Sequence, residues 1–271
     1  MKKLLLAFAA TGLSLLSFAQ TDSIPAKTND TIRVGGMIII KKGDGNKSTE
    51  VEIFNRKKNK PSNLVTNWWI FDLGFANLID NTNYSSPEAQ AFAPGLNKDQ
   101  MDLKGKSINV NIWIFMQRMN LIKQAVNLKY GLGLELNNYH FDDERIRLQK
   151  NPTQILLDPE LVSAKKNKLA ADYITVPMML NFNFSPGRRN GFGFSGGISA
   201  GYLYSARQKI KDDGKKTKLK DDFDLQRWKL SYIGELNLGP VKLYGSYAMK
   251  SMWRKGLDQT PYNVGIRFSS W

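Results

Sequence analysis

The single histidine of the chain is the first candidate for chemistry, because imidazole is the side chain that most readily gains or loses a proton near neutral pH. His140 lies just before two acidic residues, Asp142 and Asp143, either of which could orient its ring. A serine elsewhere would then serve as the nucleophile of a hydrolase-like site. No serine is fixed relative to His140 by the sequence. His140 is therefore a weak catalytic candidate, and a histidine in a loop is the simpler interpretation.

The composition narrows what the remaining residues can do. The 271 residues include no cysteine and only one histidine, which excludes disulfide frameworks, thiolate metal sites, cysteine nucleophiles and sites built on two histidines. The glycine pairs Gly131-x-Gly133 and Gly191-x-Gly193 open no helix, and no GxxxxGK[ST] sequence is present, so we expect no phosphate-binding loop. The sequence predicts no metal site and no cofactor.

The first residues have the layout of a secretory signal peptide. Met1-Lys2-Lys3 is a short cationic start, Leu4–Leu16 is mostly apolar, and Ser17-Phe18-Ala19 places small residues where a signal peptidase cuts. We therefore expect residues 1–19 to be removed on export. No later apolar run is long enough for a transmembrane helix.

Strict alternation of apolar and polar residues dominates the rest of the chain. From Val126 to Leu136 every second residue is apolar, and the residues between them are small, polar or charged. Such a strand is typical of a transmembrane barrel, with apolar side chains outside and small or polar ones inside. The second alternating segment has an expected outward set from Ile108 to Met116. The other segments begin near Trp69, Ile174, Phe192, Leu230, Val241 and Tyr262.

Long and short connections alternate between these eight segments, as they do in outer-membrane barrels. The predicted fold is all-β: an eight-stranded antiparallel up-and-down transmembrane β-barrel over residues 66–271. An even number of strands places the N- and C-termini together, and we expect both to be periplasmic. A soluble lipocalin-like barrel is the structural alternative.

A short periplasmic N-terminal extension is expected over residues 20–65. It is expected to hold a small hairpin, because Thr31–Ile40 and Ser48–Phe54 flank a glycine-rich turn. A hairpin by itself is marginally stable, so the extension should dock on the barrel opening or on a partner.

The alternation also places seven charged side chains inside the predicted barrel. Three acids and four bases in so narrow a lumen should pair, because an unpaired buried charge is strongly unfavourable. We expect a salt-bridged, filled core, and a charged conduit for ions or protons is the alternative. The seven residues are Asp72, Lys129, Glu135, Lys229, Glu235, Lys242 and Arg267.

Short basic runs carry much of the net charge of +15. Two of them, Lys165–Lys168 and Lys215–Lys218, fall in outward loops of the predicted topology, where lysines would meet lipopolysaccharide phosphates. Nearby acids at Asp212-Asp213 and Asp221–Asp224 could neutralise the second run instead. The partners expected are outer-membrane lipid and lipopolysaccharide, the barrel-assembly machinery during insertion, and an envelope protein. Nucleic acid is not expected as a partner of an exported barrel.

These features resemble the outer-membrane β-barrel domain proteins of Bacteroidota, including the PorT-like group. The resemblance covers about residues 66–271 and is carried by pattern, above all by Asn127–Glu135 and Ile174-Thr175-Val176-Pro177. It implies a barrel similar in architecture to OmpX and the OmpA transmembrane domain. It implies little about activity, although PorT itself is tied to a protein-secretion system. The chain departs from the usual outward C-terminal aromatic, because Trp271 has the inward parity of Arg267.

The function expected is that of a small non-enzymatic outer-membrane barrel with a structural or partner-docking role in the cell envelope, such as an accessory of a secretion system. A narrow solute pore or ligand-binding barrel is the first alternative. A lipid A-modifying hydrolase or acyltransferase that uses His140 is the second.

Overall fold

The computed structural model describes residues 30–34, 37–42, 50–55, 62–186, 191–239 and 241–269. The chain forms two units, Met1–Lys60 and Pro61–Trp271. The first unit contains one antiparallel sheet in the order β1-β2-β3. Its strands are β1 (Asp30–Val34), β2 (Met37–Lys42) and β3 (Glu50–Asn55).

The hairpin expected in the N-terminal extension is found in part, because β2 pairs with β3. Its first arm, Thr31–Ile40, was expected as one strand, but it forms two antiparallel strands, β1 and β2, in which Thr31 pairs with Ile40. The predicted signal peptide, the glycine-rich turn and Trp271 lie outside the described residues.

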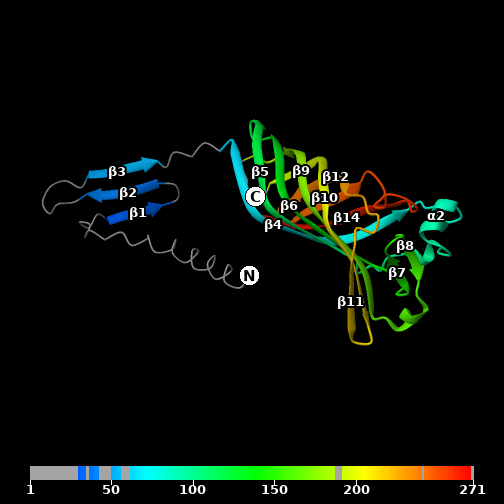
Figure 1. Ribbon diagram of the computed structural model, residues 1–271. Coiled ribbons are helices and arrows are strands. Elements are labelled where there is room, and N and C mark those ends of the chain that lie inside the picture. Colours follow the sequence, from blue (N-terminus) through cyan, green and yellow to red (C-terminus); the bar gives the residue numbers. More distant parts are fainter. Residues whose placement is uncertain are drawn as a thin grey trace, which may run out of the picture. The chain divides into compact units, whose positions relative to one another are not determined.

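Eight long antiparallel strands of the second unit pair in one closed ring (Figure 1). The order is β4-β5-β6-β9-β10-β12-β13-β14, with β14 paired back to β4, and the long β9–β10 pairing leaves no gap in the circle. The predicted eight-stranded antiparallel barrel is confirmed, and its first strand begins at Leu64, two residues before the expected start. The strands are β4 (Leu64–Asp80), β5 (Ile108–Ile122), β6 (Val126–His140), β9 (Lys166–Asn183), β10 (Phe192–Asp212), β12 (Trp228–Leu238), β13 (Val241–Ala248) and β14 (Gln259–Phe268).

The two ends of the barrel differ in the length of their connections. The short connections from β5 to β6, from β9 to β10 and from β12 to β13 lie at one end, the short-turn end. Residues 81–107, 141–165, 213–227 and 249–258 make the other end, the long-loop end. Additional elements lie at the long-loop end, of which α2, β7, β8 and β11 are labelled in Figure 1. They are α2 (Pro87–Phe92), η2 (Asp99–Met101), β7 (Ile146–Gln149), β8 (Gln154–Leu157), η3 (Pro159–Ser163) and β11 (Lys215–Lys220).

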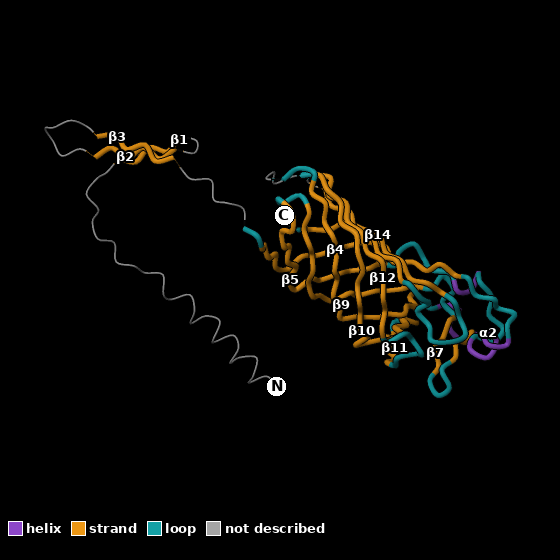
Figure 2. Tube along the Cα trace, turned by 90° about the horizontal axis from the view of Figure 1, so that it is seen from above, coloured by secondary structure: helices purple, strands orange, loops and turns teal. Residues whose placement is uncertain are grey.

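Apolar side chains form a belt around the outside of the barrel, whose strands are seen along their length in Figure 2. On β9, for example, Ile174, Val176, Met178 and Leu180 are exposed, while the residues between them are buried. Soluble surfaces rarely carry apolar patches larger than a few hundred Å², so this belt requires an apolar environment. Among the described residues, no helix is long and apolar enough to cross a membrane.

Irregular pairing shifts the alternation at several points that the sequence pattern does not reveal, including Asn120–Ile122 of β5 and Leu203–Ser205 of β10. On β5, Trp113 pairs with Gly133 and Phe115 with Leu132, so Ile114 is an extra residue. The parity changes there, and Met116 is fully buried in the barrel. The expectation that Met116 faces outward is wrong, because a bulge adds one residue without changing the residue types around it.

A further irregularity lies on β4. Trp69 has a φ of +56°, and the pairing passes from Trp68–Phe115 to Ile70–Trp113 without it. Both Trp68 and Trp69 are exposed as a result. Two adjacent indoles therefore face outward close to the short-turn end.

Candidate functional site

All seven charged residues that alternation places inside the barrel are buried. They project from five strands whose inward positions face one another across a narrow lumen. Asp72 lies on β4, Lys129 and Glu135 on β6, Lys229 and Glu235 on β12, Lys242 on β13 and Arg267 on β14.

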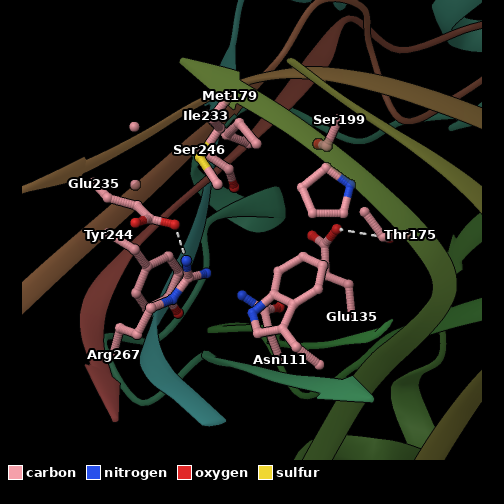
Figure 3. Close-up of a pocket in the computed structure, with 14 residues that line it drawn as sticks. Asn111, Glu135, Thr175, Met179, Ser199, Ile233, Glu235, Tyr244, Ser246 and Arg267 are labelled. Atoms are coloured by element: carbon pink, nitrogen blue, oxygen red, sulfur yellow. Dashed lines mark hydrogen bonds and ion pairs between the residues drawn. The ribbon is translucent and has the colours of Figure 1, made fainter. Parts of the chain in front are cut away.

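Arg267 is the centre of the larger of two charge clusters. Its Nε and Nη2 donate to the two carboxylate oxygens of Asp72, each at 2.7 Å. Its Nη1 donates to Glu235, an interaction drawn in Figure 3. Glu235 also accepts from Lys129 Nζ at 2.7 Å. One guanidinium and one ammonium thus neutralise two carboxylates, in the bidentate geometry that arginine favours.

Neutral donors complete the coordination of Asp72. Trp113 Nε1 donates to Asp72 Oδ2 at 2.8 Å, and Asn111 Nδ2 donates to the same oxygen at 3.1 Å. The Trp113 ring also lies 5.5 Å from the Arg267 guanidinium carbon. Because every oxygen of this buried carboxylate has a donor, the site satisfies the main condition for retaining a charge in a low-dielectric interior.

Glu135 forms the second charge cluster with Lys229, whose Nζ donates to Glu135 Oε1. The same oxygen accepts from Asn137 Nδ2 at 3.1 Å and from Asn263 Nδ2 at 3.2 Å. The Lys229 ammonium lies 4.7 Å from the centre of the Tyr173 ring, a cation–π contact. Each of the three predicted acids therefore has a basic partner inside the barrel.

Lys242 lies nearer the short-turn end of the lumen. Its Nζ donates to the backbone oxygen of Ser269 at 2.9 Å and to Ser269 Oγ at 2.7 Å. It therefore connects β13 to the residues that follow β14, an interaction that the expected pairing of acids and bases did not include.

Apolar side chains fill the space beside the charges. Ile70, Trp113, Met116 and Met179 form a small buried cluster inside the barrel. A cavity of about 30 Å³ remains among residues such as Asn111, Glu135 and Arg267 (Figure 3). A buried water needs roughly 10–15 Å³ of such space, so this cavity has room for one or two waters and is too small for a solute.

The long loops fold into a hydrophobic cap over the lumen. Phe92 of α2 packs edge-on against Trp253 with ring centroids 5.4 Å apart. The cap is tied to the barrel rim by Tyr84, whose hydroxyl donates to Asp80 Oδ2 at 2.6 Å. The sequence analysis missed this cap because loop residues show no period. Its buried residues come from all four long connections and include Ala89, Phe92, Leu96, Met101, Phe141, Ile146, Leu148, Ile155, Phe223, Leu225, Met252, Trp253 and Leu257.

His140 lies at the last residue of β6, at the long-loop end and beyond the apolar belt. Its Nδ1 is buried and has no hydrogen-bond partner among the described residues. Asp143 binds Arg145 through both carboxylate oxygens, at 2.7 to 3.2 Å. Burial lowers the pKa of His140 to about 4, assisted by nearby lysines such as Lys168. The structure thus does not bring an aspartate to Nδ1 of His140, as an oriented general base would need.

A closed antiparallel barrel with an apolar outer belt and a satisfied polar interior is a transmembrane β-barrel, because no backbone group is left unpaired in lipid. The chain belongs to the outer membrane protein beta-barrel domain family, whose sequence model matches residues 71–249. Its place is therefore the outer membrane.

One solved structure that matches is the attachment invasion locus protein Ail of Yersinia pestis. The two share 12% sequence identity, the match covers 75% of this chain and 98% of Ail, and the TM-score is 0.33. No curated protein matches the sequence.

Proposed function

We propose that this protein is a non-conducting, non-enzymatic barrel that has a structural or partner-docking role in the outer membrane. The observation that supports this most is the filled lumen. The Arg267 and Glu135 clusters occupy its middle, the cluster around Met116 lies beside them, and the hydrophobic cap covers the long-loop end. Eight strands leave space only for side chains, and here the side chains take that space.

The proposed orientation places the long-loop end outside the cell and both termini in the periplasm. Short periplasmic turns and long external loops are the rule for such barrels. In this orientation the cap is the outer surface of the protein. Because the cap is a packed structure and not a set of open loops, it favours the docking of a partner protein over the uptake of a solute. The narrower likeness to PorT-like secretion accessories is one form that this docking role would take.

Single-channel recording tests the filled lumen. Protein refolded in detergent, checked by the heat-modifiable migration of folded barrels, is inserted into planar bilayers beside a known porin. We expect no steady conductance from the wild type or from Lys250→Gln, an exposed control outside the lumen. A steady wild-type conductance that changes with Lys129→Met would overturn the proposal in favour of a narrow pore.

Labelling of single cysteines tests the orientation, since the chain has no cysteine of its own. Lys215→Cys lies on the exposed β11 strand at the long-loop end, and Pro186→Cys is exposed at the short-turn end. A membrane-impermeant maleimide should label the first on intact cells and the second only after the outer membrane is opened. The reverse pattern would refute the orientation.

A further inference from the structure

Beyond the outer edge of the apolar belt, eight cationic side chains share the outward face of the strands that extend from the barrel. We call this surface the basic face. It spans β9, β10 and β11, with His140 of β6 at its border. Its residues are Lys166, Lys168, Arg207, Lys209, Lys211, Lys216, Lys218 and Lys220.

The strand register arranges these residues in rows. In the middle row, His140 pairs with Lys168, Lys168 with Lys209, and Lys209 with Lys218. Residues that pair directly across antiparallel strands project to the same side, about 5 Å apart at Cβ. This row is therefore a line of basic side chains across four strands.

Two further rows flank the middle one. Lys166 pairs with Lys211, and Lys211 with Lys216. On the barrel side, Arg207 pairs with Lys220. The basic face is thus two-dimensional, with cations spaced along the strands and across them.

The opposite face of the same strands is fixed by burial, so the lysines cannot turn inward. Gln208 and Ile210 alternate with the basic residues of β10 and are buried. Gln208 Oε1 accepts from the backbone of Leu148 at 3.0 Å, and its Nε2 donates to the backbone of Ile146 at 2.9 Å. The β7 segment of the cap therefore holds the base of the β10–β11 hairpin and orients the basic face outward.

The cations on this face outnumber the acids that could neutralise them. Asp172 shares the outward face and forms an ion pair with Arg207. Asp212 ends β10 opposite Lys215, and Asp221 directly follows β11. Burial and the neighbouring charges of Lys166, Lys209 and Arg207 lower the pKa of Lys168 to about 8. Like charges directly opposite one another destabilise a sheet, so this arrangement is unfavourable by itself and a bound anion would relieve it.

The position of the basic face indicates where such an anion would lie. The apolar belt ends at Tyr202, Tyr204 and Trp228, which are exposed, and the rings of Tyr202 and Trp228 are 5.0 Å apart. Exposed tyrosine and tryptophan mark the level where acyl chains meet headgroups. With a rise of about 3.3 Å per residue and a tilt of about 40°, Arg207 and Lys211 lie roughly 8 to 18 Å beyond Tyr204 along the membrane normal. That is the headgroup region.

We propose that the basic face binds the phosphate groups of lipopolysaccharide in the outer leaflet around the barrel, with phosphates bridging the cross-strand rows. The charge complementarity, the outward direction and the height above the aromatic edge all fit a phosphorylated membrane lipid. In cells this inference rests on the proposed orientation, whereas the binding itself does not.

Binding to defined lipids in nanodiscs tests the proposal on the full chain. Neutral phosphatidylcholine discs carry the protein, and bisphosphorylated lipid A, dephosphorylated lipid A, inorganic phosphate and polyglutamate are compared as probes. The wild type should bind bisphosphorylated lipid A most tightly, and raising the salt concentration should weaken this binding. Equal affinity for dephosphorylated lipid A, for inorganic phosphate or for polyglutamate would overturn the assignment to lipid phosphates.

Two matched triple variants locate the site. Lys168→Gln, Lys209→Gln and Lys218→Gln together remove the lysines of the middle row. Because one lysine near an anionic surface contributes about 1 kcal/mol, we expect lipid A affinity to fall by roughly 100-fold. The control variant replaces three exposed lysines of the same barrel end outside the basic face, and it should bind like the wild type. They are Lys98, Lys215 and Lys250.

Equal affinities of the two triple variants would overturn the site even if the lipid preference held. Both variants should show unchanged heat-modifiable migration, because none of the six side chains is buried. A failure of the cysteine-labelling test with intact lipid A binding would refute only the orientation. Loss of the lipid A preference with correct labelling would refute only the basic face.

Discussion

Replacing Arg267 with methionine removes the guanidinium that joins two buried carboxylates. Methionine has a similar length and is apolar, so the substitution deletes the charge and leaves little empty volume. Asp72 would lose both of its charged hydrogen bonds, whereas Glu235 would keep Lys129 at 2.7 Å. The main consequence is therefore one uncompensated carboxylate, Asp72, which is 1% exposed.

The expected loss of stability follows from the burial of this unpaired carboxylate. Breaking a buried ion pair by removing one partner typically destabilises a protein by about 3–5 kcal/mol. Trp113 and Asn111 still donate to Asp72, which favours the lower part of that range. Adding Asp72→Asn to Arg267→Met removes the stranded charge, so the double variant should recover most of the loss.

Equilibrium unfolding in guanidinium chloride, with the barrel refolded into lipid vesicles, measures these differences. The matched control is Arg254→Met, because Arg254 also binds two carboxylates, at 2.9 and 3.0 Å, but its side chain is exposed to solvent. Its loss should change the free energy of unfolding by less than about 1 kcal/mol. If Arg267→Met were no more destabilising than Arg254→Met, or if Asp72→Asn gave no recovery, the account of the charge cluster would be refuted.

Three further predictions concern other parts of the barrel. Gly197→Ala should destabilise the barrel by about 1–3 kcal/mol in the same unfolding assay, because the added Cβ would lie 2.1 Å from a backbone oxygen. The control Gly196→Ala should be neutral, because the space around its added Cβ is open. Equal effects of the two substitutions would contradict the packing. Phe92→Ala should destabilise the cap by about 3–5 kcal/mol through the cavity left beside Trp253, seen as faster proteolysis of the long loops with the barrel strands intact. The pKa of His140 measured by NMR should be about 4. Because this folded-state pKa lies below the ordinary value of 6.5, the protein should lose stability as the pH falls from 6.5 towards 4. A measured pKa near 6.5 would contradict the buried environment of His140.

The strand alternation predicted the barrel because each strand has one face in lipid and one in a small lumen. β6 is the clearest case, since Val126 to Leu136 carry an unbroken period of two that the structure keeps. β5 is the counterexample, because the bulge at Ile114 moves Met116 to the inside. A bulge depends on how two strands pack and pair, and the residue types of either strand alone do not predict that pairing.

The pairing of the interior charges was less predictable than their burial. Lys129 and Glu235 are 106 positions apart in the chain and meet at 2.7 Å. Parity shows that both side chains point inward, but the stagger of the strands decides which inward residues share a level. The same stagger leaves Lys242 beside Ser269.

The two basic runs show a different limit of the sequence. Lys165–Lys168 and Lys215–Lys218 were expected in loops, but nearly all of these residues lie in the extended strands β9 and β11. Their polar residues hide the strands from the sequence pattern, because a strand that extends beyond the membrane does not need an apolar face. Only the register of β9, β10 and β11 reveals that the two runs face the same way.

The β10–β11 hairpin also bears on how copies of this protein behave beside one another. β11 pairs with β10 along one side, and its other edge pairs with no strand among the described residues. An open strand edge is a template on which another chain can add by β-augmentation. Lys215, Lys216, Lys218 and Lys220 line this edge, so two hairpins that approach edge to edge repel each other. These lysines should therefore disfavour edge-to-edge assembly of copies in a crowded membrane, and an anion that neutralised them would weaken that repulsion.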